Sequence, residues 1–175
     1  MSYSEGHPIK LVGGRLALDF VNTADWTPED EVAHEKLTNI ADLETWLRAL
    51  NLEQTEPVQD LQSLIDFRFR LRQLILKRTG DSVLNVVQSL DFSRAGSNAS
   101  IPFNQSITAL IAASAVSVLT DNRELKRIKM CPGNNCGWLF VDETKNGRRT
   151  WCSMESCGNR AKAARHYAKI REERL

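Results

Sequence analysis

Apolar residues recur at helical spacing in three long stretches of the chain. These stretches run from Thr38 to about Leu50, from Pro57 to Arg78, and from about Gln105 to Leu119. In each of them apolar positions fall three or four residues apart, which places them on one face of an α-helix. The middle stretch is apolar on two sides, so we expect it to be the central helix of a mainly α-helical domain.

A small β element is expected before the first of these helices. Gly13-Gly14 is a turn signal between the apolar stretches Ile9–Val12 and Leu16–Phe20. This pattern predicts either a β-hairpin or a strand that leads into a short helix. Residues 24–36 are mostly polar and charged, and they predict a loop.

Shorter elements are expected on either side of the third long stretch. Residues 81–90 predict a short helix capped by its first two residues. Residues 91–104 are rich in Ser, Asn, Ala and Gly, which predicts an exposed loop with a short strand near Ile101–Phe103. Arg123–Met130 predicts a strand or an extended lead into the C-terminal part.

Polar side chains in this helical part have competing interpretations. Asp19 and Asn22 lie among apolar residues, where such side chains usually bond to nearby backbone groups. The basic residues of the middle stretch predict a solvated or internally paired face, with anion binding as the alternative: Arg68, Arg70, Arg72, Lys77 and Arg78. A pocket around Asp19, Asn22 and Arg68 or Arg72 would be the basis for an enzyme. Because no nucleophile–base pair or open metal site is visible, we predict that the protein is not an enzyme.

Size and composition restrict the class of protein. The 175 residues suffice for one medium domain and one small domain. No apolar run reaches the ~20 residues that span a bilayer, and the N-terminus lacks the basic and apolar regions of a signal peptide. We therefore expect a cytoplasmic protein without a membrane partner. Its thiols should stay reduced, which disfavours disulfides and favours metal binding.

The net charge of +1 conceals two parts of opposite sign. Residues 1–125 contain 11 Lys/Arg and 17 Asp/Glu, whereas residues 126–175 contain 12 Lys/Arg and 5 Asp/Glu. A basic C-terminal part predicts a polyanionic partner such as DNA. The alternative is that the acidic part attracts the basic part and masks it.

All four cysteines lie in the C-terminal part, as two C-x4-C pairs with fifteen residues between them: Cys131, Cys136, Cys152 and Cys157. Pro, Gly and Asn fill the space inside the first pair, which predicts a tight turn that aims both sulfurs at one point. Four thiolates suit one tetrahedral Zn²⁺ and leave no coordination position open. The spacing therefore predicts a structural zinc site and no catalytic metal.

The residues around the cysteines predict a small zinc-stabilised fold over residues 126–175. Gly137–Asp142 is aromatic and β-branched and predicts a strand, and Arg148–Cys152 predicts its hairpin partner after a turn at Asn146-Gly147. A basic helix is expected from Cys157 to about Glu173. A turn, a hairpin and a cysteine at a helix start form a treble-clef-like arrangement.

The last helix is the segment that we expect to contact a partner. One face of this helix is expected to carry Lys162, Arg165, His166 and Lys169. Arg148 and Arg149, which precede the helix, add to the positive charge. Such a surface predicts nucleic-acid binding, with a solvated basic tail as the alternative. Three alanines are expected to pack on the finger (Ala161, Ala164, Ala168), and a third face could meet the helical domain (Ala163, Tyr167, Ile170).

The cysteine module resembles the CGNR-type zinc finger. The resemblance covers roughly residues 126–170 and rests on the run Cys157-Gly158-Asn159-Arg160, on the four cysteines, and on the tryptophans and arginines around them. Residues 14–23, GRLALDFVNT, resemble the ABATE domain that usually precedes this finger. Together these resemblances imply a bacterial, stress-responsive transcription regulator. They also imply that the four cysteines are its zinc ligands.

The resemblance leaves several roles open. We expect Asn159 to bond to the backbone of the cysteine turn and Arg160 to pair with a carboxylate such as Asp142, with phosphate contact by Arg160 as the alternative. The helical domain would sense a small-molecule effector or mediate assembly, for example as a homodimer. The alternative function is a protein-interaction module stapled by zinc. In that case Trp138, Phe140 and Trp151 would be buried or would form a partner surface.

Overall fold

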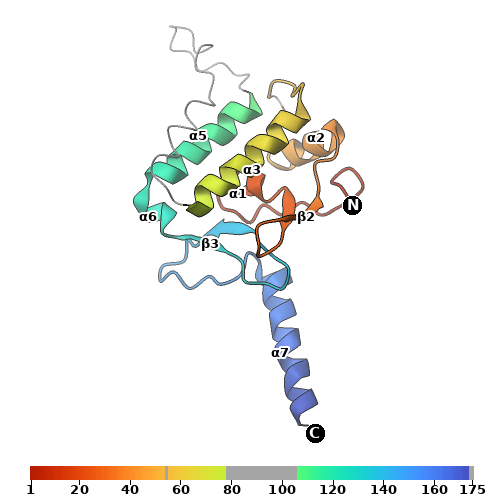
Figure 1. Ribbon diagram of the computed structural model, residues 1–175, viewed down its shortest axis with the longest axis vertical. Coiled ribbons are helices and arrows are strands. Elements are labelled where there is room, and N and C mark those ends of the chain that lie inside the picture. Colours follow the sequence, from red (N-terminus) through yellow and green to blue (C-terminus); the bar gives the residue numbers. More distant parts are fainter. Residues whose placement is uncertain (54, 78–105, 174–175) are drawn as a thin grey trace.

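The computed structural model describes residues 1–53, 55–77 and 106–173 (Figure 1). The helices and strands of these ranges, in chain order, are α1 (Leu16–Val21), β1 (Ala24–Trp26), β2 (Val32–Glu35), α2 (Ile40–Ala49), α3 (Leu61–Lys77), α5 (Ile107–Thr120), α6 (Asn122–Leu125), β3 (Ile128–Met130), β4 (Leu139–Val141), the π-helical turn η2 (Met154–Gly158) and α7 (Asn159–Glu172). The helix expected over residues 81–90, the loop 91–104 and the strand near Ile101–Phe103 lie outside the described residues. Among the described helices, none has the length and apolar character needed to cross a membrane.

The helices build a hydrophobic core around the short helix α1. α3 and α5 run side by side, and α1 packs against both of them (Figure 1). Every residue of α1 after Leu16 is buried. Its neighbours in the core are aromatic and aliphatic side chains from the other helices: Trp46, Phe67, Leu71, Ile111 and Val118. Since burying one such side chain contributes ~1.5–3 kcal/mol, α1 is the anchor that joins the longer helices.

The three long helices predicted from periodicity are confirmed, although the central one begins later than expected. α2 starts after Asn39, whose side chain accepts a hydrogen bond from the N–H of Asp42 while the Asp42 carboxylate accepts one from the N–H of Asn39. α3 does not start at Pro57. Its start is fixed by Asp60, which accepts hydrogen bonds from the N–H and the hydroxyl of Ser63.

The N-terminal β element lies in a different place from the one predicted. Residues 24–36 are not a loop, because β1 and β2 form an antiparallel hairpin with a bulge after Asp25. No strand is found at Ile9–Val12, and Leu16–Phe20 belongs to helix α1, so the alternative of a short helix after Gly13-Gly14 is the one that holds. Gly14 enters α1 with a φ of 80°, a conformation that costs glycine little.

The strand pairing of the finger also differs from the prediction. β4 pairs with the preceding strand β3, in the register Ile128↔Val141, Lys129↔Phe140 and Met130↔Leu139. Residues 148–151 form no strand. The predicted hairpin between residues 137–142 and 148–152 is therefore wrong. The strands that do pair, β3 and β4, are joined through the turn that holds Cys131 and Cys136.

The two predicted parts, residues 1–125 and 126–175, share one hydrophobic core. Ile128, Leu139 and Val141 belong to the same buried cluster as α1, α3 and α5. The Asn22 amide reproduces a strand partner, because its Nδ2 donates to the Leu139 carbonyl (2.8 Å) and its Oδ1 accepts from the Leu139 N–H (2.9 Å). The sequence predicts that the Asn22 side chain bonds to nearby backbone. This prediction is wrong, because the side chain bonds to β4, far along the chain.

Replacing Asn22 tests this connection. In Asn22→Ala two buried backbone groups of Leu139 lose their partners, and each such loss costs about 1–3 kcal/mol. We expect the free energy of unfolding, measured with urea, to fall by about 2–5 kcal/mol. Asn122→Ala removes an exposed asparagine and should change it by less than about 0.5 kcal/mol. Equal effects of the two substitutions would contradict the role of Asn22.

Candidate metal centre and basic helix

The four cysteines converge on one point. Their sulfur atoms all lie within 4.8 Å of one another, and all four side chains are buried. Cys131 directly follows β3, Cys136 lies at the end of the tight turn before β4, and Cys152 follows the long loop after β4. Cys157 lies in η2, the turn that leads into α7. One metal ion would thus tie three separate segments together.

The turn between Cys131 and Cys136 depends on its small and left-handed residues. Asn135 has a φ of 50°, which asparagine tolerates better than most residues. A Cβ added at Gly133 would lie 2.9 Å from the Cys157 sulfur. The turn therefore has no room for a larger residue at position 133 while Cys157 points at the same metal.

The donor set fits one tetrahedral zinc ion. Four thiolates around Zn²⁺ leave a net negative charge, which hydrogen-bond donors near the sulfurs can offset. The N–H of Cys152 donates to the Cys131 sulfur (3.4 Å), and the Arg160 guanidinium donates to the Cys157 sulfur (3.2 Å). Accordingly the Cys157 thiolate raises the pKa of Arg160. When bound, zinc supplies structural cross-linking here, because four protein ligands leave no position for substrate.

Two tryptophans from different parts of the chain lie under the cysteine site. The Trp138 indole N–H donates to the carbonyl of Ala24 (2.9 Å), and Trp26 is fully buried in the same cluster. The Lys36 Nζ lies 4.2 Å from the ring centroid of Trp138, and the Arg72 guanidinium lies 4.2 Å from that of Trp26. The finger, with its own Trp138, therefore rests on Trp26, Lys36 and Arg72 of the helical part.

Arg68 and Arg72 of α3 are buried and paired, which confirms the internal-pairing part of their interpretation. Arg68 pairs with Glu35 of β2, and Arg72 pairs with Asp30 and donates to the carbonyl of Gly137 (2.8 Å). Burial lowers the pKa of Arg72, and Asp30 acts in the opposite direction. Their acidic partners are not visible in the sequence. Arg68 and Arg72 are, however, four residues apart and directly follow the apolar Phe67 and Leu71, which indicates that both arginines lie close to the buried face of the helix. Arg70 on the same helix is exposed.

Asp142 organises the loop that leads to Cys152. Its carboxylate accepts hydrogen bonds from Lys129 Nζ (2.6 Å), from the N–H and hydroxyl of Thr144, and from the N–H of Arg149. Burial alone would raise the pKa of Asp142, but the bonds from Lys129 and Thr144 outweigh it and hold the pKa well below its ordinary value. This loop of polar bonds replaces the second strand of the expected hairpin.

Arg149 points into the protein. Its guanidinium donates to the carbonyls of Val12 (2.9 Å), Val141 (3.2 Å) and Cys152 (2.6 Å), and it lies 4.3 Å from the ring centroid of Phe140. These contacts connect the N-terminal segment, β4 and the second cysteine pair. Arg149 therefore supports the zinc site, whereas Arg148 beside it is exposed.

Asp19 bonds within its own segment, as the sequence predicts. Its carboxylate accepts from the N–H of Gly13 (2.8 Å). Burial raises the pKa of Asp19 to about 6, although the bonds from Gly13 and Val12 act in the opposite direction. The four side chains considered for a catalytic pocket, which are Asp19, Asn22, Arg68 and Arg72, thus all bond to protein groups.

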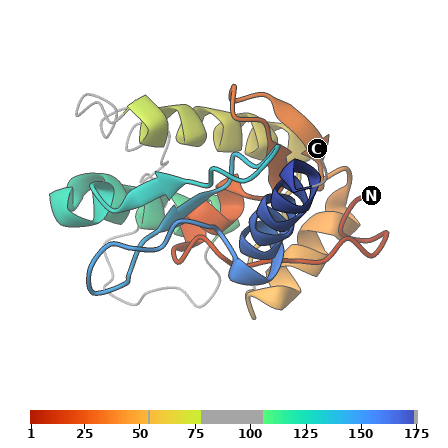
Figure 2. The same ribbon diagram turned by 90° about the horizontal axis from the view of Figure 1, so that it is seen from below.

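Helix α7 projects away from the rest of the molecule (Figures 1 and 2). None of its residues is buried. The predictions that its alanine face packs on the finger and that Tyr167 faces the helical domain are therefore wrong, and Tyr167 is 70% exposed. The structure exposes most of the predicted nucleic-acid contacts: Arg148, Arg160, Lys162, Arg165 and Lys169.

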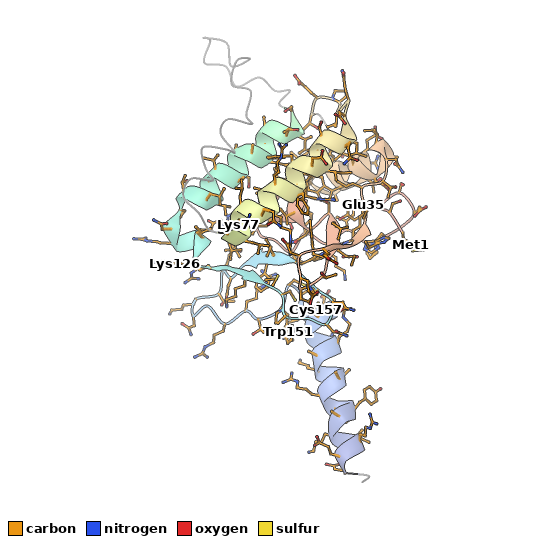
Figure 3. The ribbon with its side chains drawn as sticks, viewed as in Figure 1. Met1, Glu35, Lys77, Lys126, Trp151 and Cys157 are labelled. Atoms are coloured by element: carbon orange, nitrogen blue, oxygen red, sulfur yellow. The ribbon has the colours of Figure 1, made fainter. Side chains whose placement is uncertain are left out.

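The roles expected of Asn159 and Arg160 are also corrected. The Asn159 amide donates to the carbonyl of Glu155 (3.3 Å), one turn earlier, and does not reach the cysteine turn. Arg160 contacts Cys157, which lies where α7 joins the rest of the molecule (Figure 3). Arg160 does not pair with Asp142, whose carboxylate already accepts hydrogen bonds from Lys129, Thr144 and Arg149. Both side chains thus act at the junction of η2 and α7.

Comparison with known families agrees with this geometry. The sequence model for the CGNR zinc finger matches residues 127–169, and the model for ABATE, described as a putative stress-induced transcription regulator, matches residues 14–122. No curated protein matches the chain. With the finger matched and its four sulfurs clustered, the four cysteines form the site of one structural zinc ion. Since the ABATE match covers more than half of the chain, the protein belongs to the ABATE family and carries a CGNR zinc finger after its ABATE domain.

Proposed function

We propose that this protein is a zinc-dependent, DNA-binding transcription regulator and that α7 is the segment that contacts the duplex. The observation that carries the proposal is the exposure of α7. A helix that buries none of its residues gains little stability from packing on the body, and contact with a partner would supply that stability. Its charge favours a polyanion as that partner, because its basic side chains far outweigh the acidic Glu172.

The dimensions of α7 suit a groove of DNA. Its 14 residues span about 21 Å, and the major groove, about 12 Å wide, admits an α-helix. Lys162, Arg165 and Lys169 follow one another at three- and four-residue spacing and share one face. Arg148, exposed on the loop before Cys152, adds a further cation for phosphate.

The basic side chains of α7 are exposed, and none of the ion pairs found among the described residues joins them to the helical part. Within the described residues, the ion pair recorded for this helix joins Lys169 to Glu173 of the same segment (3.7 Å). The acidic helical part therefore does not mask it in this arrangement. Trp138 and Phe140 are buried beneath the zinc site, which is one of the two arrangements expected for the alternative, a protein-interaction module stapled by zinc. A small-molecule effector, a homodimer and a cytoplasmic location stay predictions.

Removing the basic face of α7 tests the proposal. The variant with Lys162, Arg165 and Lys169 all replaced by alanine should bind duplex DNA at least tenfold more weakly than the wild type at low salt. The slope of log K against log salt should become shallower by about 0.9 for each phosphate that the variant no longer neutralises. Fluorescence anisotropy of a labelled duplex, titrated at several salt concentrations, measures both quantities.

A matched control removes the same charge elsewhere. Arg48, Arg70 and Lys77 are exposed on α2 and α3, so their replacement by alanine lowers the net charge equally without touching α7. This control should retain wild-type affinity and salt slope. If the wild type with zinc fails to bind DNA at low salt, or if both triple variants lose affinity equally, the proposal is wrong.

A further inference from the structure

A pocket of about 340 Å³ opens beside the zinc site at the root of α7. Its walls come from the N-terminal segment, the β1–β2 hairpin, the cysteine turn and the first turn of α7, including His7, Ala33, Trp138 and Arg160. Cys136, Cys152 and Cys157 line it, whereas Cys131 does not. Three of the four zinc-binding cysteines thus line one cavity.

We propose that this pocket makes the zinc site a target for oxidation by small peroxides, with Cys136 as the residue attacked first. Oxidation of cysteine follows thiolate character and exposure. Zinc keeps the four cysteines as thiolates, and Cys136 is the most exposed of them, at 8% compared with 2% for the others. Hydrogen peroxide is little larger than water, whose share of liquid volume is about 30 Å³, so the pocket admits it easily.

The neighbouring sulfur completes the reaction. The Cys136 thiolate attacks one peroxide oxygen, the O–O bond breaks, hydroxide leaves and a sulfenic acid forms. The Cys152 sulfur lies 3.8 Å from that of Cys136. Its thiolate then attacks the sulfenic sulfur, the S–S bond forms, and a second hydroxide leaves. Two thiolates have lost two electrons, and one hydrogen peroxide has been reduced to two hydroxide ions.

The consequence falls on α7. Two sulfurs joined in a disulfide no longer serve as zinc ligands, and the remaining pair is too few for a structural site. α7 is attached through Cys157 and η2 and buries no residue of its own. After oxidation and loss of zinc, α7 should therefore no longer be held in a fixed orientation relative to the rest of the protein. Only the effect of this change on DNA binding rests on the proposed function; the oxidation and the loss of zinc do not.

The oxidation itself is tested without DNA. Zinc-loaded protein is treated with hydrogen peroxide, zinc release is followed with a colorimetric chelator, and the disulfides are mapped by mass spectrometry. We expect zinc release in step with a Cys136–Cys152 disulfide. Retention of zinc and of all four thiols, after glutathione in the same tube is fully oxidised, would overturn the proposal. So would a first disulfide that contains Cys131.

Narrowing the pocket tests the route of access. Ala33→Trp places a large side chain on the pocket wall, while Val32→Trp adds the same bulk at the adjacent residue of β2, which does not line the pocket. With tert-butyl hydroperoxide, Ala33→Trp should release zinc about tenfold more slowly than the wild type. Val32→Trp should match the wild type. Equal rates in the two variants would show that the pocket is not the route.

Discussion

Removal of zinc is expected to lower the thermal midpoint of the whole protein by about 20 °C or more. A structural zinc ion contributes ~10–16 kcal/mol to small cysteine-rich folds, and each kcal/mol shifts the midpoint by about 2–4 °C in a chain of this size. The effect should reach beyond the finger because Ile128, Leu139 and Val141 belong to the core of the helical part. Differential scanning calorimetry with and without a strong chelator measures it.

Two variants separate zinc binding from other effects of the chelator. Cys157→Ser removes one ligand and should reproduce the shift without chelator, whereas Thr150→Ala, at an exposed position close by, should leave the midpoint unchanged. Re-addition of zinc should restore the wild type but not Cys157→Ser. A helical part that melts at the same temperature with and without zinc would contradict the shared core.

Replacement of Arg72 by leucine is expected to lower the free energy of unfolding by about 3–5 kcal/mol. The guanidinium is fully buried, pairs with Asp30, donates to Gly137 and stacks on Trp26. Its loss leaves the half-buried Asp30 carboxylate without its ion pair and the buried Gly137 carbonyl without a donor, beneath the zinc site. Urea unfolding followed by tryptophan fluorescence gives the value.

The same helix supplies the control for this substitution. Arg70 lies two residues earlier and is exposed, so Arg70→Leu should change stability by less than about 0.5 kcal/mol. Asp30→Asn keeps the shape of the partner but removes its charge, and should fall between the two. If Arg72→Leu and Arg70→Leu cost the same, Arg72 does not join the helical part to the finger.

Local patterns predicted those features of the fold that depend on nearby residues. Helical periodicity located α2, α3 and α5, because each buries one face against the core. The cysteine spacing predicted the zinc site, because each pair places two sulfurs close together in the sequence and one metal ion can join the two pairs. In both cases the determining residues are close in the sequence.

Features that depend on distant partners could not be predicted in this way. β1 and β2 contain charged residues that suggest a loop, but Glu35 is neutralised by Arg68 of α3 and Asp25 by the buried Lys36. Arg149 has the composition of a phosphate contact, yet its acceptors include the carbonyl of Val12 near the N-terminus. Only the folded chain shows that these charges are used internally.

The most direct test of the proposed role of α7 is hydrogen–deuterium exchange of the zinc-loaded protein with and without a mixed-sequence DNA duplex at low salt. Amides of α7 should exchange quickly in the free protein, since the helix buries none of its residues. With DNA, protection should increase over Asn159–Glu172 and near Arg148, while α2 and α3 stay unchanged. Protection elsewhere with no change in α7 would contradict a DNA-binding role for this helix.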